Sequence, residues 1–143
     1  MRTNRSRRST GYADSPSSCR RAVTRLPEEA AAPGRARTFT TSALEAWEVP
    51  PDSREDIVLA ASELVTNAVE HGHGDVTVVL RRSDDHVLLR VWDDDVRVPA
   101  PRPAGHDPVR GNGLVIVDAV SEAWGYETSR DGKWVWAEFA VPA

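Results

Sequence analysis

The sequence has one cysteine and no long hydrophobic run. Cys19 cannot form an intramolecular disulfide, and a lone thiol indicates neither a metal site nor a nucleophile. No stretch of about 18 apolar residues is present, so no membrane-spanning helix is predicted. The N-terminal segment also lacks the apolar region of a signal peptide. These absences favour a cytoplasmic protein without a membrane partner.

Positive charge is scarce outside the N-terminal segment. Residues 1–25 contain seven arginines and one acidic residue, whereas residues 26–143 carry a net charge of −10. Phosphate contacts require clustered cations, so the acidic body argues against nucleic acid as a partner. Residues 1–20 lack apolar periodicity and are rich in Ser and Arg, which predicts a disordered basic tail. Residues 21–143 are long enough to form one folded domain.

Two helices are expected in the first half of the domain, after a short strand at residues 21–26. Residues 28–47 are mostly compatible with a helix, although the Ala-Pro-Gly sequence at 32–34 breaks or delays it. Residues 55–71 carry apolar side chains at helical spacing, which defines one buried face. We expect Asp52 or Ser53 to cap this second helix, and Ser53 with Asp56 resembles a capping box.

Strands dominate the second half. Residues 75–82 and 86–95 alternate apolar and polar side chains around a turn, which predicts a hairpin. A Pro-rich loop follows at 96–110, then a helix at 111–124 and a final hairpin that turns near Gly132. Helices that alternate with a mainly antiparallel sheet predict an α/β two-layer sandwich, in which helices cover one face of a mixed sheet.

The sequence ELVTNAVEHG in the second helix has an unusual polar stripe. Glu63, Asn67 and His71 follow one another at intervals of four residues, so they stack along one side of the helix. An Asn carbonyl oxygen suits Mg²⁺, and a carboxylate one turn earlier could orient a hydroxyl group or water for attack on a phosphate. Taken alone, the pair is more simply explained as the solvated side of the helix.

Two more features lie further along the chain. Asp93 ends an apolar strand, where its carboxylate could accept a hydrogen bond from the amine of adenine and repel the carbonyl of guanine. An Asp in a strand-ending turn is the simpler alternative. The glycines of Gly111–Gly113 would let the backbone approach a phosphate at the start of a helix, although such glycines are common at loop-to-helix junctions. The order of the motifs is more informative than each alone.

With these motifs in this order, the chain resembles the GHKL ATPase superfamily, whose nucleotide site is the Bergerat fold. ELVTNAVEHG resembles the N box of that superfamily, VWDDD its first glycine box and GNGLVIV its second. The compact size and the ending DGKWVWAEF are similar to the bacterial anti-sigma-factor serine/threonine kinases. The resemblance covers nearly all of the expected folded domain.

The resemblance implies a role for each matching residue. Glu63 would be the catalytic base, Asn67 the Mg²⁺ ligand and Asp93 the residue that binds adenine. The other implied nucleotide contacts are Arg110, Gly111, Gly113 and Leu114. The resemblance implies a glycine where this chain has Asp95, and the DDD run adds negative charge near the nucleotide. The extra carboxylates are expected either to weaken nucleotide binding or to point into water, and solvent screening favours the second outcome.

The implied function is that of an ATP- and Mg²⁺-dependent serine/threonine protein kinase that regulates transcription by partner switching. Its implied partners are a STAS-like anti-anti-sigma protein and a sigma factor, and the resemblance suggests a homodimer. A non-catalytic ATP-binding interaction module is the alternative, which Asp95 keeps open. A sensor histidine kinase would need an upstream phosphoacceptor histidine, and residues 1–26 contain no histidine.

Several residues outside the motifs have simpler expected roles. His71 and His73 lack further ligands for a zinc site, so capping of the helix end or packing beside the nucleotide is expected. Lys133 is expected to be a solvated hairpin lysine, with a phosphate contact as the alternative. The tryptophans of the C-terminal segment are expected in the core or on a sheet face: Trp124, Trp134 and Trp136.

Overall fold

A computed structural model describes residues 19–95 and 113–142 of the chain. The elements in order are β1 (Arg20–Leu26), α1 (Ala32–Ala46), α2 (Pro51–His71), β2 (Val76–Arg82), β3 (His86–Asp93), α3 (Gly113–Val120), β4 (Ala123–Thr128) and β5 (Lys133–Ala140). The expected basic tail and Pro-rich loop fall almost entirely outside the described residues. In the described ranges, no helix is both long and apolar enough to cross a membrane.

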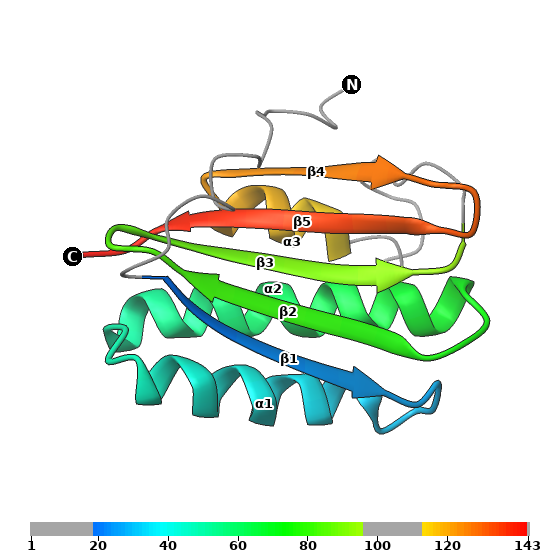
Figure 1. The fold of residues 1–143 in the computed structure, drawn as a ribbon, viewed down its shortest axis with the longest axis horizontal. Helices are drawn as coiled ribbons and strands as arrows, with labels where there is room; N and C mark the ends of the chain where they lie inside the picture. Colours follow the sequence, from blue (N-terminus) through cyan, green and yellow to red (C-terminus); the bar gives the residue numbers. More distant parts are fainter. Residues whose placement is uncertain (1–18, 96–112, 143) are drawn as a thin grey trace.

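The strands form one sheet in the order β1-β2-β3-β5-β4, and every pairing is antiparallel. The three helices cover one face: α2 packs across β2 and β3, with α1 on one side of it and α3 on the other. Figure 1 shows this layer of helices behind the strands. The predicted α/β two-layer sandwich is confirmed, with a purely antiparallel sheet among the described strands in place of the mixed one.

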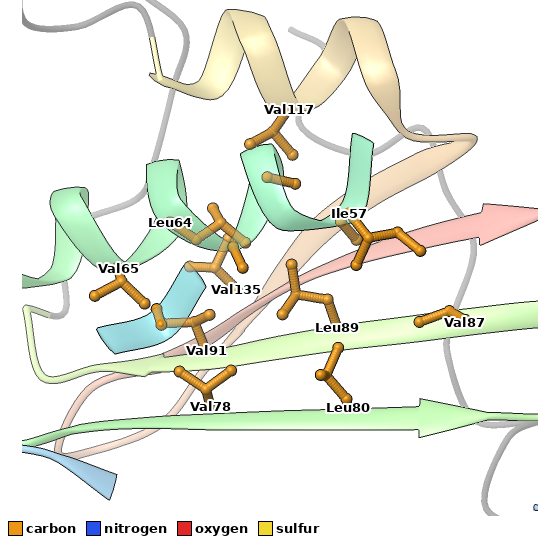
Figure 2. Close-up of a cluster of buried hydrophobic side chains, with 14 of the residues drawn as sticks. Ile57, Leu64, Val65, Val78, Leu80, Val87, Leu89, Val91, Val117 and Val135 are labelled. Atoms are coloured by element: carbon orange, nitrogen blue, oxygen red, sulfur yellow. The ribbon is translucent and has the colours of Figure 1, made fainter. Parts of the chain in front are cut away.

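The core lies between the sheet and α2. Alternate strand residues point toward the helices and are buried: Val78, Leu80, Val87, Leu89 and Val91. The apolar face of α2 meets them through Ile57, Leu64 and Val65, and Val117 of α3 completes the layer (Figure 2). The apolar face defined by the period of two in the strands therefore packs against the apolar face defined by helical spacing in α2, as the sequence predicts.

The expected side-chain cap of α2 is wrong. The helix begins at Pro51, its N-cap residue is Pro50, and no side chain makes a capping hydrogen bond. The backbone N–H of Arg54 donates to the carbonyl of Pro50 at 2.9 Å. Proline is well suited to the first helical position because its φ is already helical and it has no N–H to leave unsatisfied. The helix therefore starts before Asp52 and Ser53.

The helix expected at residues 111–124 is shorter than predicted at its C-terminal end. The hydroxyl group of Ser121 donates to the carbonyl of Val117 at 2.6 Å, after the last helical residue, Val120. Trp124 belongs to β4, where its side chain is fully buried and its indole N–H donates to Asp118 at 2.9 Å. The apolar pattern therefore continues from α3 into β4, so the sequence pattern alone does not locate the end of the helix.

The other face of the sheet carries tryptophan and arginine side chains. The rings of Trp92 and Trp134 meet edge to face at 5.4 Å, and the guanidinium of Arg90 lies 4.4 Å from the centre of the Trp134 ring. Trp136 is buried against Leu88 and lies over Gly125 of β4. The tryptophans thus divide between the core and this sheet face, as expected.

The core makes a direct prediction about stability. Leu89→Ala removes a fully buried side chain and should lower the free energy of unfolding by about 2–5 kcal/mol, because it leaves a cavity between β3 and α2. The matched control is Leu59→Ala on α2, where the side chain is 40% exposed and the loss should be under about 1 kcal/mol. Urea unfolding of both variants gives the comparison, and equal losses would contradict the assigned core.

Candidate functional site

Three separate parts of the chain meet at the end of β3. A Cβ atom added to Gly72, just after α2, would lie 3.2 Å from Oδ1 of Asp93 and 2.6 Å from Oδ1 of Asp94. A Cβ atom added to Gly132, in the β4–β5 turn, would lie 2.5 Å from the carbonyl oxygen of Asp93. Both glycines therefore permit a backbone approach that a larger residue would block. Asp93 lies between the end of α2 and the last hairpin.

Glu63 and Asn67 lie on α2, one turn apart on its half-buried side. Burial raises the pKa of the Glu63 carboxyl, and the negative charge of Glu70 raises it further. A carboxylate with a raised pKa is a stronger proton acceptor, which suits a general base. The structure therefore places the predicted base and the predicted Mg²⁺ ligand on the helix whose C-terminal end reaches Asp93.

Asp93 is almost fully buried and has partners on both carboxylate oxygens. Oδ1 accepts a hydrogen bond from the backbone N–H of Asp95 at 2.8 Å, and Oδ2 lies 3.4 Å from Nζ of Lys133. Burial raises the pKa of Asp93, while the Asp95 N–H and the Lys133 charge oppose this. The carboxylate is therefore held in one orientation by the backbone that follows it and by the next strand.

The prediction that Lys133 is a solvated hairpin residue is wrong. Its side chain is only 4% exposed, and its ammonium group donates to the carbonyl of Asp95 as well as pairing with Asp93. Lys133 lies directly opposite Asp93 in the β3–β5 register. Alternation along β5 gives the reason, because Lys133 is in phase with the core residues Val135 and Ala137. The same alternation was the available signal in the sequence.

The second aspartate of the DDD run anchors a loop. Oδ1 of Asp94 accepts a hydrogen bond from the backbone N–H of His73 at 2.6 Å, and a Cβ atom at Gly74 would lie 2.7 Å from Oδ2. This carboxylate therefore faces the backbone between α2 and β2 and does not simply point into water. The rings of His71 and His73 are on exposed residues.

Only part of the segment predicted as the second glycine box lies within the described residues. Gly113 begins α3, which packs against α2, and Leu114 is buried in the main core. Arg110 and Gly111 lie outside the described residues. The nucleotide contacts expected of these four residues stay predictions.

The donor set on α2 fits Mg²⁺ better than a metal that needs a protein cage. Asn67 offers an amide oxygen at a half-exposed position, near the carboxylate of Glu63 along the helix. Within residues 19–95 and 113–142, no group of three or more His, Cys, Asp or Glu side chains is arranged to hold a metal. Mg²⁺ commonly takes one or two protein oxygens and completes its shell with water and phosphate oxygens.

The raised pKa of Glu63 predicts a pH-dependent cost in stability. The folded state holds the proton of Glu63 more tightly than the unfolded chain, so the charged form destabilises the fold as pH rises through the folded pKa. Glu63→Gln should therefore raise the free energy of unfolding at neutral pH and leave it unchanged well below about pH 4, where both states are protonated. Glu70→Gln is the matched control, with a smaller gain. Urea unfolding at both pH values tests this, and an equal gain at both would contradict it.

Comparisons with known proteins identify the family and the fold of the chain. Residues 26–139 match the family model of the histidine kinase-like ATPase domain, which covers most of the chain. No curated protein sequence matches. The crystal structure of the RsbU and RsbW domains of Rv1364c from Mycobacterium tuberculosis has a similar fold, with a TM-score of 0.67 and 22% sequence identity over 85% of this chain and 32% of that longer one. The resemblance inferred from the motifs is confirmed, and the chain belongs to the histidine kinase-like ATPase family, which implies that it binds ATP.

Proposed function

We propose that the protein is an ATP- and Mg²⁺-dependent serine/threonine kinase of the anti-sigma-factor type. The observation that carries the proposal is the half-buried Glu63, whose pKa is raised and which lies one turn before Asn67 on α2. The C-terminal end of this helix lies beside Asp93. A nucleotide-binding domain that only changes shape has no need of a carboxylate tuned as a base. Burial of such a charge lowers stability, which favours a functional reason for retaining it.

The residues divide the reaction between binding and proton transfer. Asp93 would accept a hydrogen bond from the adenine amine, and Asn67 would hold Mg²⁺, which neutralises phosphate charge when bound. Glu63 would accept the proton of the substrate hydroxyl group while the oxygen of that hydroxyl group forms a bond to the γ-phosphorus. The bond from that phosphorus to the β–γ bridging oxygen breaks, and ADP leaves. The products are a phosphoserine or phosphothreonine, ADP and a proton on Glu63.

The proposed setting is partner switching. The proposed substrate is a STAS-like anti-anti-sigma protein, the second partner is a sigma factor, and the active species is a homodimer. Two observations support this setting: the similarity of the C-terminal sequence to anti-sigma-factor kinases, and the fold shared with a chain that contains an RsbW domain beside an RsbU domain.

A non-catalytic ATP-binding interaction module is the second candidate. Its support is that both oxygens of Asp93 already have partners within the protein, Asp95 and Lys133. Adenine would have to share a carboxylate that is already engaged. A weak nucleotide site could still change the conformation of the domain without supporting turnover.

Two substitutions on α2 separate these candidates. Glu63→Ala should leave ATP affinity nearly unchanged and lower phosphoryl transfer by about 10²- to 10⁴-fold, the usual contribution of a general base. Asn67→Ala should impair both Mg²⁺-dependent ATP binding and transfer. The assay is transfer of radiolabelled phosphate to a STAS-like protein that the chain binds. Transfer that survives Glu63→Ala would remove the base assignment, and no transfer by the unmutated protein would favour the module.

The preference for adenine over guanine tests the role of Asp93 separately from catalysis. ATP should bind more tightly than GTP because a carboxylate attracts the amine of adenine and repels the carbonyl of guanine. Losing a charged acceptor costs about 1.5–3 kcal/mol, so Asp93→Asn should lower ATP affinity by roughly 10- to 150-fold. Calorimetry with Mg²⁺ measures both effects. Equal affinities for ATP and GTP in the unmutated protein would refute the role of Asp93.

A further inference from the structure

Lys133 is a buried charge with no part in the reaction above. It is the only lysine in the sequence, and the other seventeen of the eighteen Lys and Arg residues are arginines. It is also nearly inaccessible to solvent and contacts the carboxylate that the proposed function assigns to adenine. Burying an ammonium group is costly unless it is paired and hydrogen-bonded. The burial of Lys133 therefore needs a structural or functional reason.

The geometry points to Lys133 as a positioning residue that keeps Asp93 a charged, correctly oriented acceptor for the amine of a 6-aminopurine. This inference rests on the proposed role of Asp93 in adenine binding. Lys133 itself does not contact the base. It acts through the Oδ2 contact at 3.4 Å and through its hydrogen bond to the carbonyl of Asp95, the residue whose N–H holds Oδ1.

The need for such a residue follows from burial. A protonated carboxyl would present an O–H donor to the base and could no longer serve as an acceptor on both oxygens. Burial favours that protonated form by raising the pKa of Asp93, and the positive charge of Lys133 lowers it. Without Lys133, the carboxyl should take up a proton at a higher pH and lose its affinity for the amine there.

Few other charges act on Asp93. Asp95 raises its pKa, so its charge adds to the effect of burial. Asp94 directs its carboxylate to the backbone of His73, and α2 contributes the backbone around Gly72 at this point. Among the described residues, Lys133 is therefore the cation that offsets burial at this carboxylate.

The shape of the lysine side chain suits the place. Its ammonium group is compact and has three N–H donors, and it reaches two oxygens of the β3 end from the first position of β5. A planar guanidinium is larger and presents its donors in a fixed fork. In a chain that otherwise uses arginine for every cation, a lysine at this buried position is consistent with a requirement for a small charge.

The test compares ATP with purine riboside triphosphate, which lacks only the 6-amino group, across pH in the full chain. In the unmutated protein, ATP should bind about 10- to 150-fold more tightly, the value of a hydrogen bond to a charged group. In Lys133→Met this preference should be lost at a higher pH than in the unmutated protein, and it should fall to within about threefold once the carboxyl is protonated. Affinity for the analogue should change little. Arg130→Met, which removes an exposed charge from the same turn, is the control and should behave as the unmutated protein.

Lys133→Gln covers the case in which the methionine variant does not fold. Glutamine retains a donor for the Asp95 carbonyl but has no charge, so it should show the same loss of preference at low pH. The unmutated protein gives a readout that needs no variant. With ¹⁵N-lysine labelling, the chemical shift of the single ammonium signal should change when the carboxyl of Asp93 takes up a proton.

The possible outcomes separate the inference from the function on which it rests. Equal weakening of ATP and the analogue at every pH in Lys133→Met would mean a general structural role and would overturn the inference. An ammonium signal that is indifferent to Asp93 would overturn it as well. If the unmutated protein binds ATP and the analogue equally, the adenine role of Asp93 is refuted before Lys133 is tested.

Discussion

The burial of Asp93 is the constraint on which the site depends. A carboxylate at this depth needs partners for its oxygens, and the protein supplies them from the residue after β3 and from the first residue of β5. The chain also has to approach closely at Gly72 and Gly132 for these elements to meet. The end of α2, the end of β3 and the last hairpin therefore meet around this single polar group.

Two carboxylates of the site are kept in surroundings that disfavour their charge. Burial raises the pKa of both Glu63 and Asp93, but among residues 19–95 and 113–142 a cation lowers the pKa of Asp93 only. The difference matches the proposed roles. A residue that accepts a hydrogen bond throughout binding should stay charged, whereas a base should take up a proton readily during the reaction. The two environments are thus consistent with the proposed binding role of Asp93 and the proposed reacting role of Glu63.

Most of the fold follows from local patterns in the sequence. The alternation in β2 and β3 and the helical spacing in α2 predict which side chains meet in the core, because each pattern defines one apolar face. The motifs likewise predict that Glu63 and Asn67 share a stripe and that Asp93 ends a strand. These are properties of single elements, and the sequence specifies them directly.

Features that depend on pairing between distant segments were harder to predict. Alternation along β5 places Lys133 on the buried face, whereas its contact with Asp93 depends on the β3–β5 register, which is not set by either strand alone. The cap expected at Asp52 or Ser53 is wrong because Pro51 already occupies the first helical position of α2. Both errors concern residues whose role is decided by what lies beside them.

Asp95 stands where the motif resemblance implies a glycine, and it contacts its neighbours through its backbone. The N–H of Asp95 donates to Asp93, and its carbonyl accepts from Lys133, so both of these contacts use main-chain atoms. A residue of any type other than proline supplies them in this conformation. The hydrogen bonds that hold the Asp93 carboxylate, which we propose binds adenine, therefore do not require glycine. What the substitution adds is charge, which acts on Asp93 in the same direction as burial and increases the demand on the one lysine that opposes them.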